Sequence, residues 1–203
     1  ALALVLILFF AATVDRAVNK AVDQLANAGR WTYVFNSEDL TGWHGDTAFW
    51  SVENGELIGK STGDQPRDLF LILNESLDDF ELYCEFQLVG AVGNSGIHIS
   101  STDVESDGVK GYQVNLTYED FTLLRCLIDG EGLDRNELWL TEKSKTRLRQ
   151  AVNQTGWNSL SIKADGRLTK IQLNEVTTDV RCVPQTTKSV AIALQLAGSQ
   201  AME

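Results

Sequence analysis

Apolar and polar side chains alternate strictly between Phe80 and Leu88, and this alternation constrains the fold more than any other feature of the chain. Successive side chains of an extended strand point to opposite faces, so a period of two buries one face and leaves the other polar. The same period recurs at 96–100, 111–118, 122–128, 157–164, 169–173 and 190–196. We therefore predict an all-β domain, a sandwich or jelly roll of two antiparallel sheets.

Turn and helix signals agree with this prediction. Asp165-Gly166 separates two of the alternating segments and favours a hairpin turn. After Trp31, only residues 142–152 are expected to form more than a brief helix. The chain ends at Glu203, shortly after the segment 190–196, so we expect the sandwich to lack its last strand.

Residues 1–12 are continuously apolar, too short to span a bilayer comfortably, and of the length of a signal-peptide core, although no initiator Met or basic segment precedes them. Between Val14 and Leu25 apolar residues recur at helical spacing, which predicts a short N-terminal amphipathic helix. We interpret 1–30 as a signal-peptide-like segment or membrane-anchor helix and 31–203 as the jelly roll. The protein is then expected to be secreted, periplasmic or anchored to the cell envelope; a buried N-terminal helix is the alternative.

The charge of the chain restricts its partners. Lys and Arg number 17 against 28 Asp and Glu, a formal net charge of -11, which repels phosphate backbones and excludes nucleic acid as the expected partner. An anionic surface suits neutral sugars. The cysteines Cys84, Cys126 and Cys182 have neither zinc nor disulfide spacing, and the first two lie in apolar segments, so buried thiols are expected.

Several blocks of the sequence, taken in order, resemble one known family. They lie at 31–43, 50–59, 79–86, 93–97, 111–112, 156–158 and 191–196, and include the sequences GNSGI and AIALQL. Together they resemble the 3-keto-disaccharide hydrolase domain family over residues 31–203. The resemblance implies a concanavalin-like jelly roll, exported by glycan-degrading bacteria, that acts on glycosides already oxidised at C3.

The resemblance also implies a chemistry. A ketone at C3 acidifies the hydrogen at C2, so a base removes that proton, the substituent at C1 is expelled, and water then adds to the unsaturated sugar. Such a reaction needs a base and either a divalent metal or strong hydrogen-bond donors for the enediolate. Three positions depart from the family, which usually has Glu at Gln113, Arg at Ser100 and His at Ala197. All three fall on the polar face by parity.

Two residues are candidates for catalysis. His98 projects from the polar face and is one of only 2 histidines, and Glu85 is a carboxylate on the polar face of the preceding strand. Either can act as a base, and together they can ligate a divalent metal such as Ca, Mn or Zn. The structural alternatives are a histidine satisfied at the sheet surface and a solvated glutamate.

Further polar-face residues are candidates for binding. An amide row, defined as Asn94, Gln113, Asn115 and Gln195, offers uncharged donors and acceptors for the hydroxyls of an oligosaccharide or glycoside. The aromatic residues Tyr83, Tyr118 and Trp139 can stack on a sugar ring. His44 lies in the segment after Trp43, where it reaches the rim of the site or faces water.

Three interpretations follow from the sequence. The first is an enzyme that cleaves 3-keto-glycosides by elimination and hydration. The second is a catalytically inactive, lectin-like carbohydrate-binding module of the cell envelope. The third is a structural envelope domain without a small ligand.

Overall fold

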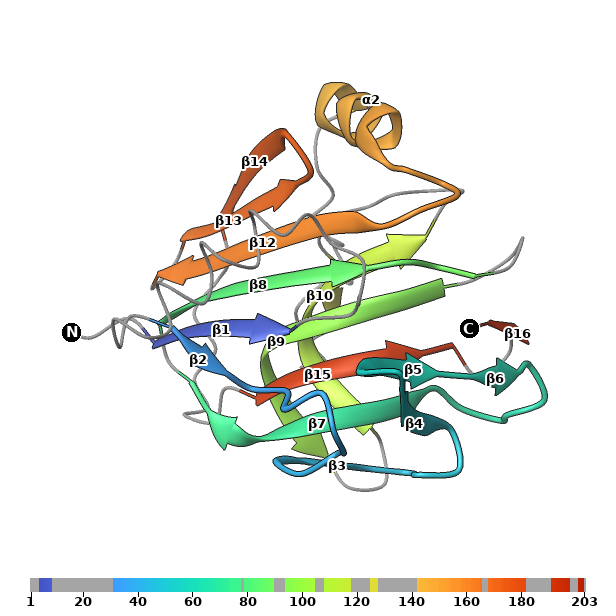
Figure 1. Cartoon of the computed structure of the whole chain (residues 1–203). Helices are drawn as coiled ribbons and strands as arrows, with labels where there is room; N and C mark the ends of the chain where they lie inside the picture. The colour runs from blue at the N-terminus through green and yellow to red at the C-terminus, as the bar shows by residue number, and fades with distance from the viewer. Residues whose placement is uncertain are drawn as a thin grey trace, which may run out of the picture.

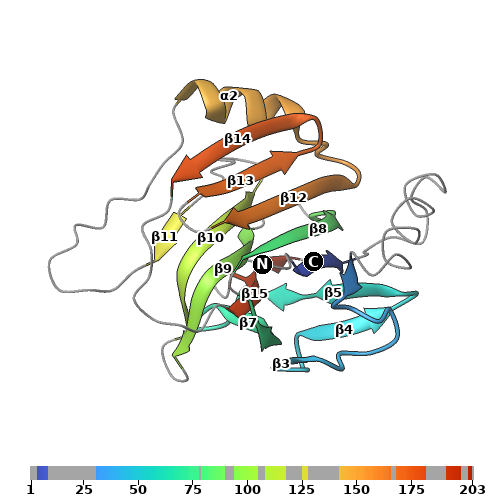
Figure 2. The same ribbon diagram turned by 90° about the vertical axis from the view of Figure 1, so that its left-hand side faces the viewer.

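Two six-stranded sheets pack against each other as a sandwich, seen in Figure 1 and, after a quarter turn, in Figure 2. The computed structural model describes residues 4–8, 31–77, 79–89, 94–104, 108–117, 125–127, 142–165, 168–181, 191–197 and 201–202. Within these ranges the predicted all-β architecture is confirmed.

The first sheet, sheet A, has the strand order β14-β13-β12-β8-β1-β2. Its strands are β14 (Val176–Arg181), β13 (Leu168–Leu173), β12 (Asn158–Asp165), β8 (Phe80–Phe86), β1 (Leu4–Leu8) and β2 (Thr32–Tyr33). The pairs β8–β12, β12–β13 and β13–β14 are antiparallel, and β1 runs parallel to both β8 and β2. β12 and β13 pair up to Asp165 and Leu168, as predicted for two strands joined by a hairpin, and Gly166 of the predicted turn falls outside the described residues.

The second sheet, sheet B, has the strand order β11-β10-β9-β15-β7-β3 and is antiparallel throughout. Its strands are β11 (Arg125–Leu127), β10 (Gly108–Thr117), β9 (Asn94–Val104), β15 (Ala191–Leu196), β7 (Leu69–Ser76) and β3 (Trp43–Gly45). β8 and β9 follow each other along the chain but lie in different sheets, because β8 pairs with β12 and β1 while β9 pairs with β10 and β15.

The core fills the space between the two sheets. Leu82 and Cys84 of β8 and Ile97 and Ile99 of β9 are at most 2% exposed and belong to one apolar cluster. Full burial of one such aliphatic side chain contributes about 1.5–3 kcal/mol to stability. The inward parity predicted for both strands is therefore confirmed, and so is the buried thiol of Cys84.

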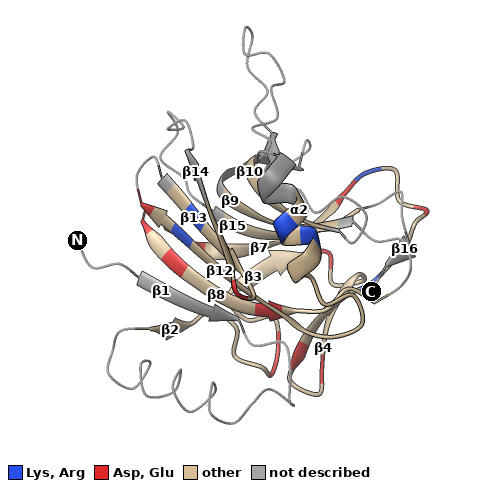
Figure 3. Cartoon of the chain, turned by 90° about the horizontal axis from the view of Figure 1, so that it is seen from above, with Lys and Arg blue, Asp and Glu red and all other residues tan. Residues whose placement is uncertain are grey.

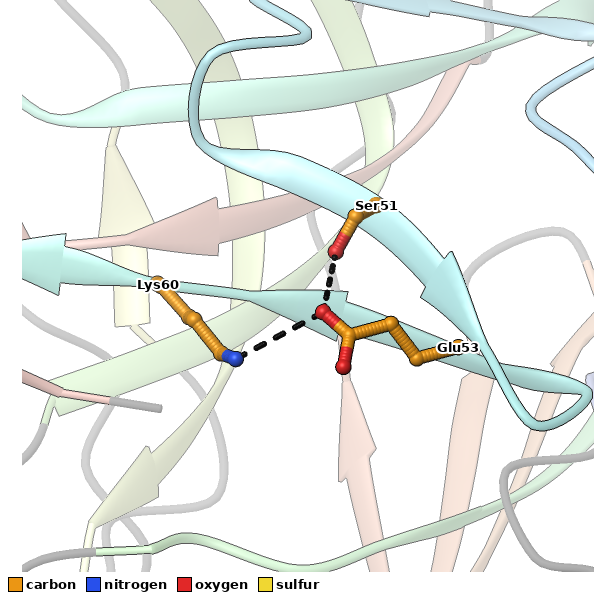
Figure 4. A network of polar contacts seen from close by, with 3 residues as sticks. All are labelled: Ser51, Glu53 and Lys60. Atoms are coloured by element: carbon orange, nitrogen blue, oxygen red, sulfur yellow. Dashed lines mark hydrogen bonds and ion pairs between the residues drawn. The ribbon is translucent and has the colours of Figure 1, made fainter.

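A short hairpin of β4 (Trp50–Glu53) and β5 (Glu56–Gly59) covers one end of this core. Its two-residue turn has positive φ at Asn54 and Gly55, as an Asn-Gly turn of this kind requires. On its outer side Glu53 accepts a hydrogen bond from Ser51 at 3.3 Å and pairs with Lys60 at 3.6 Å (Figure 4). Both partners of this ion pair are about half exposed, so it adds little to stability.

The helix predicted at 142–152 is present as α2 (Glu142–Ala151). A network of hydrogen-bonded asparagines joins the end of α2 to sheet A. Asn174, which has a φ of 50°, donates to the last helical carbonyl, that of Ala151, and to Asn158. The Asn158 amide in turn donates to the carbonyls of Asn153 and Gly156 at 2.9 and 3.2 Å. The block at 156–158 therefore fixes the entry into β12.

The apolar N-terminal run provides the strand β1, which lies between β8 and β2 in sheet A. The amphipathic helix predicted between Val14 and Leu25 falls outside the described residues. Across the part of the chain that the structure describes, there is no helix both long and apolar enough to cross a membrane. Export of the protein stays a prediction. Near the other end, β16 (Ala201–Met202) pairs with β6 (Ser61–Thr62).

Candidate functional site

The outer face of sheet B, which turns away from the core, carries most of the residues predicted to bind a sugar. In the strand register Gln113 of β10 lies opposite His98 of β9. Two positions along β9, Gly96 lies between Asn115 of β10 and Gln195 of β15. The structure therefore brings these polar side chains together on one face, from strands that are distant in sequence.

A chain of hydrogen bonds runs across this face. The Nε2 atom of Gln113 donates to Oε1 of Gln195 and lies 3.4 Å from Oδ1 of Asn115. Nε2 of Gln195 donates to Oδ2 of Asp68 at 2.5 Å. An ionised carboxylate only accepts hydrogen bonds, so Asp68 requires Gln195 to turn its NH₂ group outward and its carbonyl towards Gln113. The orientation of both amides therefore follows from one charge.

Gly96 makes this chain possible. A Cβ atom at Gly96 would lie 2.2 Å from Nε2 of Gln113 and 2.7 Å from its Cγ, which no real pair of atoms tolerates. The missing side chain leaves a gap over β9, and the side chain of Gln113 crosses that gap to reach Gln195 on the next strand but one. Gly96 is thus required for space.

The centre of this face is covered, whereas the sequence predicted an open polar surface. His98 is 0%, Gln113 1% and Gln195 4% exposed. The ring of Phe70 packs edge-on against His98, with centroids 5.3 Å apart and an interplanar angle of 85°. Asp68 is exposed and Asn115 is half-buried, so the polar groups that solvent reaches lie at the rim.

A second, small apolar cluster lies on the strands of this sheet. It comprises Ile72, Val109 and Ala193, with Phe70 packed against it, and it is separate from the main core. The segment 191–196 is apolar at every position except Gln195. A strand with so few polar positions is typical of burial on both faces, and this signal could have predicted the cover.

The other predicted binding residues divide between the rim and the undescribed parts. His44 lies on β3 opposite Ile72, is exposed, and has Nδ1 2.5 Å from Oδ1 of Asn74. Asn94 begins β9, but its side chain falls outside the description, as does that of Ser100. Tyr118 and Trp139 also lie outside the described residues.

Glu85 and Tyr83 lie on sheet A, which corrects their predicted place beside His98. Both alternate with core residues of β8 and so face away from sheet B. Tyr83 donates its hydroxyl to Glu85 Oε1 at 3.2 Å. Burial raises the pKa of the Glu85 carboxyl above its ordinary value, and burial together with the neighbouring carboxylate raises the pKa of Tyr83.

The face around Glu85 is a charged sheet surface. Lys163 of β12 pairs with Glu81 of β8, and Figure 3 shows acidic and basic positions side by side on the strands of this sheet. A metal held jointly by Glu85 and His98 does not fit this arrangement, because the core lies between the two residues. Among the residues that the structure describes, no group of three or more His, Cys, Asp or Glu side chains is placed to hold a metal ion.

Asp68 is the residue of the site that the sequence interpretation missed. It precedes β7, whose first residues, 69–73, are all apolar and show no alternation from which parity can be assigned. The register places Phe70 opposite Gln195, so Asp68 lies two positions beyond, on the same face. Only the pairing of β7 with β15 reveals that this carboxylate joins the amide row.

A cavity of about 160 Å³ lies between the sheets, under the β4–β5 hairpin. Its walls are mainly apolar and include Trp50, Leu57, Cys84, Phe86 and Trp157. It lies on the core side of sheet B and not on the face that carries the amide row. Apolar walls offer few partners for sugar hydroxyls, so the outer face remains the better candidate.

Comparison with known proteins identifies the family. Residues 30–202 match the 3-keto-alpha-glucoside-1,2-lyase-like domain. The chain belongs to this family. The resemblance seen in the sequence is thereby confirmed, and the function of this lyase-like domain is carbohydrate-related. Comparison with curated protein sequences gives no significant match.

Solved structures share the fold of the lyase-like domain. A candidate glycosyl hydrolase from Parabacteroides distasonis superposes with a TM-score of 0.59 at 18% identity, covering 84% of this chain and 89% of that one. A second crystal structure of the same description gives 0.53 at 16%, covering 81% and 90%. The potassium-bound carbohydrate recognition domain of Emp46p gives 0.51 at 14%, covering 80% and 85%. These neighbours confirm the lectin-like, concanavalin-type jelly roll.

Proposed function

We propose that this lyase-like domain takes a 3-keto-glycoside onto the outer face of sheet B and cleaves it by elimination followed by hydration. Two findings support the proposal: membership of the family, and the hydrogen-bonded chain in which Gln113 and Gln195 end on the exposed carboxylate of Asp68. This run of hydrogen bonds is the single observation that favours the outer face of sheet B over the other surfaces.

Elimination requires residues that bind the sugar and a base that removes its C2 proton. The ketone makes the C2 hydrogen acidic, and its removal places negative charge on the oxygen at C3. The neutral amide of Asn115, at the rim, suits the sugar hydroxyls, because an amide both donates and accepts without introducing a charge. Its N–H groups can also donate to the oxygen that becomes negative.

Among the described residues, the rim carries the carboxylate of Asp68 and the amide of Asn115, and no group of three or more His, Cys, Asp or Glu side chains is placed to hold a metal ion. The divalent metal considered from the sequence therefore stays a prediction. His98, the base proposed from the sequence, lies fully buried against Phe70 and meets a substrate only if that ring moves. In this arrangement His98 has a packing role beneath Phe70.

Sugar binding without turnover is the second candidate function. It is favoured by one observation: the centre of this face holds Gln113, a neutral side chain that is 1% exposed. An amide in that place cannot accept the C2 proton. The two functions share the same surface and differ only in whether a base stands at its rim.

Incubation with a 3-keto-glucoside and, in parallel, with the same glucoside unoxidised distinguishes the two. The lyase function predicts that only the ketone is consumed; the binding function predicts saturable binding by calorimetry without loss of either sugar. Asn115→Ala removes hydrogen bonds worth about 1–1.5 kcal/mol and should weaken binding roughly tenfold. Thr177→Ala, at an exposed position of sheet A, is the matched control and should change nothing. If the wild type neither consumes the ketone nor binds either sugar saturably, both functions are rejected.

A further inference from the structure

The base that accepts the C2 proton of the 3-keto-glycoside has not yet been assigned among the described residues. Several of the described side chains on the outer face of sheet B are amides, and an amide does not accept a proton at neutral pH. The imidazole of His98 is buried and 0% exposed. Of the ionisable side chains that the structure describes on this face, two are exposed: Asp68 before β7, and His44 on the edge strand β3.

The hydrogen bonds distinguish between these two. Asp68 is joined directly to Gln195, and through Gln195 to Gln113, so it belongs to the amide row. His44 is hydrogen-bonded to Asn74 on β7. The 2.5 Å contact from Gln195 holds the Asp68 carboxylate in one orientation at the exposed end of the hydrogen-bonded row that begins at Gln113.

We propose that Asp68 is the catalytic base of this domain. The inference rests on the proposed lyase function. The neutral amide of Gln113 connects the centre of the face to Asp68 through Gln195.

The step balances with the groups present. The C2–H bond of the 3-keto-glycoside breaks, the proton passes to an Asp68 oxygen, and the electron pair forms the C2–C3 double bond of an enolate whose charge rests on the C3 oxygen. The enolate electrons then form the C1–C2 double bond and expel the C1 oxygen, which takes the proton back from Asp68 or from water. Addition of water to the unsaturated ketone completes a net hydrolysis, with no change in oxidation state overall.

Exchange of the C2 hydrogen for deuterium tests the base directly. The wild type is incubated with a 3-keto-glucoside in D₂O, and the loss of the C2 proton signal is followed by NMR against an enzyme-free sample. Asp68→Asn should lower both exchange and turnover by at least about a hundredfold, the usual contribution of a general base. Calorimetric affinity of Asp68→Asn for the same sugar should change less than about tenfold, because the amides remain. Asp68→Glu keeps a carboxylate and should retain more activity than Asp68→Asn.

The outcomes separate this inference from the proposed function. If the wild type exchanges the C2 hydrogen and Asp68→Asn does so within about threefold of it, the lyase function stands and Asp68 is not the base. A loss confined to His44→Gln assigns the role to His44 and overturns the inference in the same way. If the folded wild type neither exchanges the C2 hydrogen nor consumes the 3-keto-glucoside, both the inference and the lyase function are rejected. Urea unfolding of each variant verifies that the fold is kept, which the exposure of Asp68 leads us to expect.

Discussion

Replacing Gly96 with alanine tests the geometry of the amide row most sharply. The φ of Gly96 lies outside the left-handed region, so alanine meets no backbone strain there, and the effect should come from space alone. The new Cβ would stand 2.2 Å from Nε2, 2.7 Å from Cγ and 2.8 Å from Cδ of Gln113. The amide must therefore leave its place, and its hydrogen bond to Gln195 breaks.

The expected cost is the sum of two effects. Gln113 and Gln195 are 1% and 4% exposed, so a displaced amide leaves buried polar groups unsatisfied, at about 1–3 kcal/mol. Crowding in a packed layer costs about 1–3 kcal/mol more when side chains cannot relax fully. We expect Gly96→Ala to lower the free energy of unfolding by at least about 2 kcal/mol, the sum of the two lower limits.

A double-mutant cycle with Gln113→Ala isolates the contact. Without the glutamine side chain the new methyl group has room, so Gly96→Ala should cost less than about 1 kcal/mol in that background, a coupling of roughly 1–3 kcal/mol. Urea denaturation followed by tryptophan fluorescence measures all four proteins. Equal costs of Gly96→Ala in both backgrounds would refute the crossing of Gln113 over β9.

Two further predictions concern sheet A and its border. Asn158→Asp replaces an amide that donates to the carbonyls of Asn153 and Gly156 with a carboxylate, whose oxygens repel those carbonyls. The variant should lower the free energy of unfolding, measured in urea, by about 3 kcal/mol. A decrease below about 1 kcal/mol would mean that these hydrogen bonds are not formed. Burial raises the pKa of Glu85, so its neutral form contributes stability at pH values below its ordinary pKa, and that contribution is lost as pH rises through the raised value. The wild type should therefore lose more stability between pH 4 and pH 8 than Glu85→Gln does, whereas parallel pH profiles would place Glu85 in solvent.

Local alternation predicted which side chains share a face. Along β9 and β10, Ile97 and Val114 enter the core while His98 and Gln113 turn to the other side, as the period of two requires. The physical reason is that a strand allows only two directions for successive side chains. The same rule gave the inward face of β8 and the buried Cys84.

Alternation says nothing about which strands are neighbours or what covers a face. Glu85 and His98 were placed together because β8 and β9 are consecutive in sequence, yet the pairing of β8 with β12 and of β9 with β15 puts them in separate sheets. Asp68 could not be found because the apolar start of β7 carries no period. Both facts depend on contacts between distant segments, which a local pattern does not contain.

A crystal structure of Asp68→Asn with a 3-keto-glucoside tests the central claim most directly, since this variant should bind the sugar without consuming it. We predict that the sugar ring lies on the outer face of sheet B, with a hydroxyl on Asn115 and its C2 carbon facing residue 68. A sugar bound instead on sheet A beside Tyr83 and Glu85, or in the cavity between the sheets, would contradict it.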